Sequence, residues 1–165
     1  MSANVIKKQA VTSTLPYFMR GRIVRGFRRG SDQLDCPTAN LDRCTADSVS
    51  ASLSCGVYFG WARVERNNDS DNQSVWPVVM SIGRNPHFKN ADITVEVHMM
   101  NYHGGNLYDR KLSVIILGFI RQMAVYDSIE ELKRAIDEDK RFALDRLAQP
   151  ECEAFTTHEF FIEQM

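Results

Sequence analysis

Cysteine is scarce in this sequence, and its spacing argues against two kinds of site. The four cysteines, at positions 36, 44, 55 and 152, form no Cys-x-x-Cys pair and have no histidine partner at zinc spacing. Neither a structural zinc site nor a disulfide framework is therefore indicated. We expect reduced thiols in a cytoplasmic protein.

Long apolar runs and a strong charge of one sign are also missing. No stretch approaches the 18 or so apolar residues of a membrane span, so we expect no membrane association. The formal net charge of −1 argues against a general nucleic-acid binder. A cluster of arginines between Arg20 and Arg29, with Tyr17, Phe18 and Phe27, leaves single-stranded nucleic-acid binding as a minor alternative.

Acidic residues are absent from residues 1–31. Mitochondrial transit peptides share this composition, so a mitochondrial location is the alternative to a cytoplasmic one. A chain of 165 residues suits one domain with a substantial core.

The apolar pattern predicts strands first and a helix last. Alternating, β-branched and aromatic residues predict strands at 17–25, 55–64, 75–83, 93–100 and 112–120. From Ser128 the apolar residues recur at helical spacing up to Leu147, and Ser128 with Glu131 forms a capping box, while Pro150 is expected to end the helix. This order predicts a mainly β protein, a small closed antiparallel barrel with a C-terminal α-helix packed outside.

Three further segments carry weaker predictions. Residues 41–54 are polar and lack a firm period, so we predict a connection there. Residues 65–74 contain no apolar side chain and should form a solvated hairpin loop. Residues 155–162 are predicted to be a short apolar strand or helix that docks on the body of the domain.

Residues 25–40 combine glycines, arginines and side-chain oxygens in one short stretch. Gly26 and Gly30 allow backbone N–H groups to approach a ligand oxygen, which suits a phosphate. Thr38 and Asn40 point the same way on an extended segment, and their hard oxygens suit magnesium. An ordinary basic surface loop remains the alternative reading of this composition.

Glu96 interrupts an apolar strand pattern, and so does His98. Val95, Val97 and Met99 alternate with them, so both polar side chains lie on the opposite strand face, which could line the barrel mouth. A carboxylate there could serve as a general base, although an outward-facing strand residue would show the same pattern. His98 could orient Glu96 or could be a packed structural histidine.

Several blocks of this sequence follow one another in the order and spacing of a known family. The first is Leu15-Pro-Tyr-Phe-Met-Arg-Gly-Arg-Ile-Val-Arg-Gly-Phe-Arg-Arg-Gly-Ser, followed by Pro37-Thr-Ala-Asn40. Further blocks follow in order at Gly56-Val-Tyr-Phe-Gly-Trp-Ala, Ser81-Ile-Gly-Arg-Asn-Pro-His-Phe-Lys-Asn90, Val95-Glu-Val-His-Met-Met100, Gly118-Phe-Ile-Arg121 and Tyr126-Asp-Ser-Ile-Glu-Glu-Leu. In these blocks the sequence resembles the eukaryotic-type riboflavin kinases, or flavokinases. Because the blocks begin at Leu15, we expect residues 1–14 to be a flexible extension and 15–165 to be a single barrel domain.

The resemblance implies a six-stranded Greek-key barrel that transfers the γ-phosphate of ATP to the 5′-hydroxyl of riboflavin, giving FMN and ADP. It implies the following roles: Glu96 as the catalytic residue; Gly26, Asp32, Thr38, Met99, Asn101 and Tyr108 at the nucleotide; Arg121 and Tyr126 at the flavin; Thr38 and Asn40 at the metal. The expected ion is Mg²⁺, with Zn²⁺ or Mn²⁺ as alternatives, and the expected state is a monomer.

The sequence departs from the family pattern at some positions in these blocks. Arg28 and Asp35 replace glycines, Asp32 replaces a usual lysine, Arg84 replaces a tryptophan, and Val97 replaces the threonine after the catalytic glutamate. The changes at Arg28, Asp32 and Val97 motivate one alternative, a flavin-binding barrel module that has lost catalysis.

Overall fold

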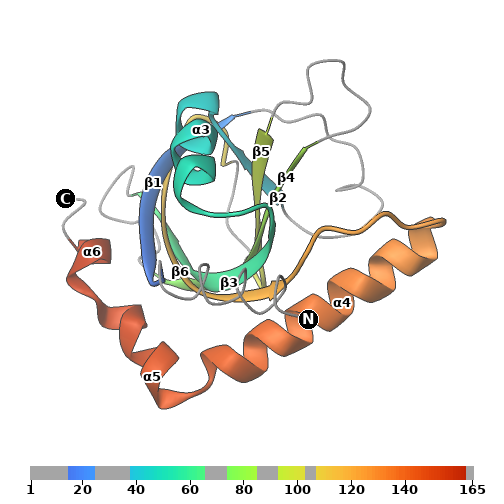
Figure 1. The fold of residues 1–165 in the computed structure, drawn as a ribbon. Coiled ribbons are helices and arrows are strands. Elements are labelled where there is room, and N and C mark those ends of the chain that lie inside the picture. The colour runs from blue at the N-terminus through green and yellow to red at the C-terminus, as the bar shows by residue number, and fades with distance from the viewer. Residues whose placement is uncertain (1–14, 25–37, 66–73, 85–92, 103–106, 163–165) are drawn as a thin grey trace.

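The computed structural model describes residues 15–24, 38–65, 74–84, 93–102 and 107–162, which form a barrel with helices around it (Figure 1). The strands are β1 (Tyr17–Val24), β2 (Thr38–Leu41), β3 (Gly56–Val64), β4 (Trp76–Arg84), β5 (Ile93–Met99) and β6 (Lys111–Arg121). The helices are α3 (Arg43–Ser52), α4 (Ile129–Leu147), α5 (Pro150–Glu153), the 3₁₀ turn η1 (Ala154–Thr157) and α6 (Glu159–Ile162).

The six strands close into an antiparallel barrel in the order β1-β2-β5-β4-β3-β6. Strands β3, β4 and β5 are consecutive neighbours, and β6 returns to lie beside β3, which is the Greek-key arrangement. The predicted fold class, a six-stranded Greek-key barrel with a C-terminal helix outside, is confirmed.

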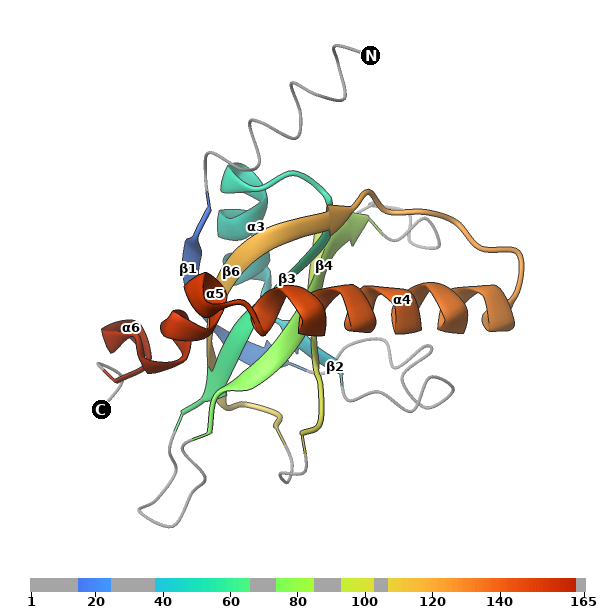
Figure 2. The same cartoon turned by 90° about the horizontal axis from the view of Figure 1, so that it is seen from below.

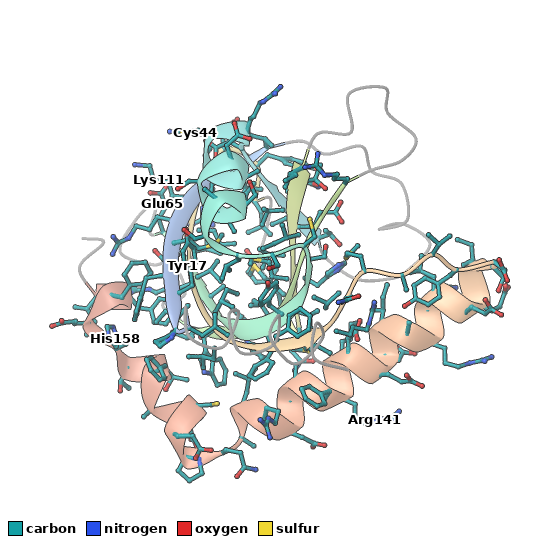
Figure 3. The ribbon with its side chains drawn as sticks, in the orientation of Figure 1. Tyr17, Cys44, Glu65, Lys111, Arg141 and His158 are labelled. Atoms are coloured by element: carbon teal, nitrogen blue, oxygen red, sulfur yellow. The ribbon has the colours of Figure 1, made fainter. Side chains whose placement is uncertain are left out.

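Two apolar layers stabilise this arrangement. The first fills the barrel, whose interior is packed with side chains (Figure 3). Ile23, Met80 and Val97 belong to this layer and are almost fully buried. The second lies on the outer wall, where Val57, Phe59 and Val79 pack with residues of α4. Strand β3 is therefore buried on both faces, which explains why its sequence is apolar almost without interruption.

Helix α4 crosses the outer wall of the barrel (Figure 2). The side chain of Ser128 accepts a hydrogen bond from the Glu131 backbone N–H at 3.2 Å, and the Glu131 carboxylate accepts one from the Asp127 N–H at 3.2 Å. The predicted cap at Ser128 is thus confirmed, with the reciprocal bond made one residue earlier than in a standard capping box. Ala143 and Leu147 anchor the C-terminal half of the helix on the wall.

The C-terminal tail docks on the barrel, as predicted. Phe161 of α6 is 2% exposed, the guanidinium of Arg20 donates to the Phe160 carbonyl at 2.7 Å, and that of Arg63 donates to the Phe161 carbonyl. Pro150 is the first residue of α5, and α4 has already ended at Leu147, two residues before the last position that Pro150 would allow.

The prediction of a connection at 41–54 is wrong, because α3 lies there. Its sequence is rich in Ser, Thr and Asp, but Ala46, Val49 and Leu53 are buried and join the barrel interior, so α3 closes one end of the barrel. Gly21 makes room for it, since a Cβ at Gly21 would lie 2.7 Å from the Thr45 side chain. Tertiary packing thus overrides weak local propensity.

The predicted loop at 65–74 falls mostly outside the described residues, as does the predicted extension at 1–14. None of the helices in the described ranges is long and apolar enough to cross a membrane.

Candidate active site

The outer face of β5 carries the polar side chains that the sequence singled out. Val95, Val97 and Met99 are fully buried inside the barrel, so the alternating residues Glu96 and His98 project from its outer wall. The predicted strand face is confirmed. It does not line the barrel mouth, however: it lies on the wall beneath α4 and the segment 123–126.

Strand β2 adds two further polar side chains beside these. The antiparallel register pairs Thr38 with His98 and Asn40 with Glu96. Thr38 Oγ1 and His98 Nδ1 are 3.0 Å apart, which is hydrogen-bonding distance. Paired residues on neighbouring strands have Cβ atoms about 4.5–5.5 Å apart, so the four side chains form one compact polar patch.

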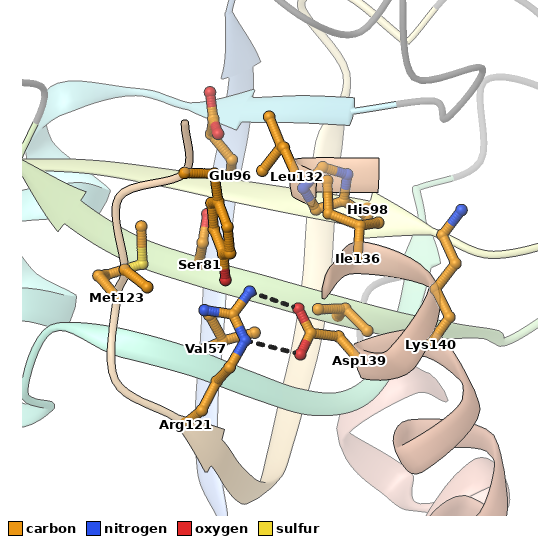
Figure 4. Close-up of a pocket in the computed structure, with 13 residues that line it drawn as sticks. Val57, Ser81, Glu96, His98, Arg121, Met123, Leu132, Ile136, Asp139 and Lys140 are labelled. Atoms are coloured by element: carbon orange, nitrogen blue, oxygen red, sulfur yellow. Dashed lines mark hydrogen bonds and ion pairs between the residues drawn. The ribbon is translucent and has the colours of Figure 1, made fainter. Parts of the chain in front are cut away.

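A pocket of about 190 Å³ opens over Glu96 and His98 (Figure 4). Its floor is the barrel wall, one side is α4, and the other is the segment after β6. The lining residues are Val57, Val79, Ser81, Glu96, His98, Arg121, Met123, Ala124, Tyr126, Leu132, Ile136, Asp139 and Lys140. The mixture of an apolar wall with a few charged groups is typical of a small-molecule site.

An ion pair between Arg121 and Asp139 connects the end of β6 to α4 in this pocket. Arg121 Nε donates to Asp139 Oδ1 at 2.8 Å, and Nη2 donates to Oδ2 at 2.7 Å, a bidentate arrangement that fixes the plane of the guanidinium. Its central carbon lies 5.8 Å from the centre of the Tyr126 ring. Arg121 and Tyr126, predicted together at the flavin, are therefore neighbours on one side of the pocket.

Burial sets the protonation behaviour of the two polar residues on β5. It raises the pKa of Glu96 above its usual value, because the carboxylate loses solvation. It lowers the pKa of His98 to about 4, with the positive charge of Lys140 adding to the effect. At neutral pH Glu96 is therefore a stronger base than an exposed glutamate, and His98 is a neutral ring.

Comparisons with known proteins show the family of the chain. The family described as Flavokinase: Riboflavin kinase matches residues 13–147. The chain is 42% identical over 137 residues to a human protein called riboflavin kinase, covering 83% of this chain and 84% of that one, and 40% identical to a riboflavin kinase of Pyricularia oryzae, covering 82% and 74%. The chain belongs to the riboflavin kinase family.

A solved structure supports the same assignment. The crystal structure of riboflavin kinase from Trypanosoma brucei superposes with a TM-score of 0.67 at 27% identity, and the match covers 88% of each chain. The match in structure thus supports the same family as the matches in sequence.

Three of the predicted nucleotide residues lie away from the pocket. Met99 is fully buried inside the barrel, Asn101 is exposed just after β5 with φ 63°, and Tyr108 packs against the barrel core. None of these three lines the pocket. Asn101 is five residues along the chain from Glu96 and lies in the turn that follows β5. Gly26 and Asp32 lie outside the described residues.

Sequence reasoning missed the contribution of α4 to the pocket. Asp139 is 4% exposed and lies in the apolar stripe of the helix, three residues after Ile136 and four before Ala143. A carboxylate in that stripe was the signal available in the sequence, because a buried charge is costly unless it is paired. Lys140, its neighbour, carried no comparable signal.

Proposed function

We propose that this chain is a riboflavin kinase that transfers the γ-phosphate of ATP to the 5′-hydroxyl of riboflavin, giving FMN and ADP. The observation that carries the proposal is the position of Glu96: a partly buried carboxylate in a partly apolar pocket, paired across strands with Asn40, which shares its face of β2 with Thr38. Membership of the family supplies the substrate class, and this geometry supplies a base and oxygen ligands within one patch.

In the proposed reaction Glu96 accepts the proton of the ribityl 5′-hydroxyl. The hydroxyl oxygen forms a bond to the γ-phosphorus while the bond from that phosphorus to the bridging oxygen of ADP breaks. The raised pKa of Glu96 suits this role, because a base with a pKa nearer the working pH accepts the proton more readily. His98 is not needed as the base when its Nδ1 is engaged with Thr38.

The residues on β2 fit a magnesium ion. Thr38 and Asn40 are alternate residues on the same face, and both offer the neutral oxygen atoms that a hard cation accepts beside phosphate oxygens. When bound, Mg²⁺ neutralises phosphate charge. We propose Mg²⁺ in preference to Zn²⁺, since the set contains no softer nitrogen or sulfur ligand; Mn²⁺ accepts the same oxygen ligands and is the alternative ion.

The flavin and the nucleotide are proposed to approach from different sides. Arg121 and Tyr126 would contact the flavin, where a guanidinium and an aromatic ring suit a flat heteroaromatic system. The nucleotide would lie toward β2, with Gly26, Asp32, Thr38, Asn101 and Tyr108 as proposed contacts. Met99, whose side chain is enclosed in the barrel, could contribute only its backbone.

We further propose a monomeric, cytoplasmic enzyme. The closed barrel leaves no unpaired sheet edge for association in the described strands. Cys44, Cys55 and Cys152 are free thiols, which fits a reducing compartment.

One assay tests the function directly. Purified protein is incubated with riboflavin, ATP and Mg²⁺, and FMN is separated by HPLC, with parallel reactions that omit ATP or contain EDTA. We expect FMN to form only in the complete reaction. Riboflavin binding without any FMN formation would contradict the proposal and favour a module that has lost catalysis.

A further inference from the structure

The side chains of Thr38 and His98 meet across two neighbouring strands of the barrel. The two residues are direct partners in the β2–β5 ladder, and Thr38 Oγ1 lies 3.0 Å from His98 Nδ1. Glu96, two residues before His98 on the same face, is the partner of Asn40 instead. Each proposed metal ligand on β2 thus has its own polar neighbour on β5.

A threonine hydroxyl has one proton and two lone pairs, and it can rotate about its C–O bond. A metal ion binds through a lone pair, so the proton must point elsewhere. The partner that accepts this proton decides where the lone pairs point. Groups that orient metal ligands in this way affect metal affinity by about 10–100-fold.

We propose that His98 is a positioning residue for the proposed metal ligand Thr38: its Nδ1 accepts the Thr38 hydroxyl proton and thereby directs the Oγ1 lone pairs toward the ion. This inference rests on the proposed function, since it requires Thr38 to bind the ion that accompanies the nucleotide. The matching ring tautomer carries its proton on Nε2, and Nδ1 is the acceptor.

The same hydrogen bond separates the roles of the two residues on β5. A ring nitrogen that accepts the Thr38 proton has no second lone pair for the riboflavin hydroxyl. Glu96 is therefore assigned as the proton acceptor, and the proposed role of His98 is exerted through Thr38. Threonine is β-branched and has few side-chain rotamers, so one hydrogen bond is enough to hold Oγ1 in place.

The test measures how strongly Mg²⁺ promotes ADP binding. The dissociation constant of ADP is determined by calorimetry with Mg²⁺ and with EDTA, and the ratio of the two values gives the metal coupling. His98→Leu fills a similar volume but accepts no hydrogen bond, so the coupling should fall at least tenfold while ADP binding in EDTA changes less than about twofold. His98→Asn places an amide oxygen near the Nδ1 position and should keep the coupling within about threefold of the parent.

Thr38→Ala completes the experiment as a double-mutant cycle. If the inference holds, Thr38→Ala lowers the metal coupling as strongly as His98→Leu does. The metal coupling of the double variant then differs by less than about twofold from that of either single variant. If His98→Leu does not fold, His98→Gln replaces it, because its amide lies one carbon further from the backbone and does not reproduce the Nδ1 position.

The outcomes distinguish this inference from the proposed function. A loss of coupling in Thr38→Ala without a loss in the His98 variant overturns the inference and leaves the metal site intact. Unchanged coupling in Thr38→Ala overturns the proposed metal site and the inference with it. Equal weakening of ADP binding with Mg²⁺ and with EDTA in His98→Leu, not restored by His98→Asn, would show a purely structural role and would also overturn the inference.

Discussion

The ion pair between Arg121 and Asp139 makes the sharpest stability prediction. The substitution Asp139→Asn keeps the size of the side chain but removes its charge. It also leaves one acceptor oxygen for the Arg121 guanidinium, which now donates to both carboxylate oxygens of Asp139. The Asp139 side chain is 5% exposed and that of Arg121 is 28% exposed, so the pair is neither fully buried nor on the surface. Its loss leaves a partly buried cation without its counter-charge.

The expected magnitude follows from this intermediate position. Removing one partner of a fully buried pair costs about 3–5 kcal/mol, whereas exposed pairs contribute at most about 1 kcal/mol. We therefore expect Asp139→Asn to lower the free energy of unfolding by about 2–3 kcal/mol. For a protein of this size, each kcal/mol shifts the Tm by about 2–4 °C, so the Tm should fall by about 4–12 °C.

Riboflavin binding should weaken in the same variant. Arg121 is held by Asp139 across two hydrogen bonds, and a released guanidinium must be ordered again when the flavin binds. Ordering one long side chain costs about 0.5–1.5 kcal/mol, which corresponds to roughly a two- to thirteenfold loss of affinity.

The assay combines thermal unfolding with riboflavin fluorescence quenching on one preparation. Asp137→Asn is the matched control, because it makes the same chemical change at an exposed position of the same helix and should shift stability by less than about 0.5 kcal/mol. If Asp139→Asn has the Tm and the riboflavin affinity of the control, the ion pair does not organise the pocket and the reasoning is refuted.

Three shorter predictions follow from other parts of the structure. Because the pKa of His98 is about 4 in the native state, the unfolded state protonates His98 first as the pH falls from 6.5 to 4. The free energy of unfolding of the metal-free parent should therefore fall by up to about 3 kcal/mol relative to that of His98→Asn. Denaturant titrations that show no such relative fall would contradict this prediction. Ser128→Ala removes the N-cap of α4 and should lower the free energy of unfolding by about 1 kcal/mol. An unchanged Tm in thermal unfolding would contradict this. Gly60→Ala places a Cβ 2.0 Å from the Ile115 carbonyl oxygen and should prevent or severely weaken folding; a parent-like circular dichroism melt would show that the β3–β6 contact can open.

The β-sheet positions of the site could be predicted from sequence because they depend on alternation. Val95, Val97 and Met99 show which face of β5 is buried, and this places Glu96 and His98 on the other face without knowledge of the fold. The same alternation places Thr38 and Asn40 on one face of β2. The pairing of these two strands was not readable from either segment, since it depends on which non-consecutive strands become neighbours when the barrel closes.

The helical side of the site was harder to predict. Helix α4 was evident from its period, but a helical stripe does not show which strands it covers, so the pairing of Asp139 with Arg121 remained hidden. Helix α3 was missed altogether, because its helical state depends on burial of a few apolar residues at one end of the barrel. The secondary structure of a segment can be predicted from its own sequence when one face of the segment is strongly apolar. In other segments it depends on tertiary contacts.

Glu96→Gln tests the central claim most directly, and kcat for FMN formation is the quantity to measure. Glutamine keeps the shape of the side chain but cannot accept the proton, so kcat should fall by about 10²–10⁴-fold, while riboflavin binding stays within about threefold of the parent. Burial already disfavours the carboxylate, which raises the pKa of Glu96, so the variant should be at least as stable as the parent at pH 8. A fall in kcat of less than about fivefold, with folding and binding intact, would show that Glu96 is not the base and would contradict the proposed mechanism.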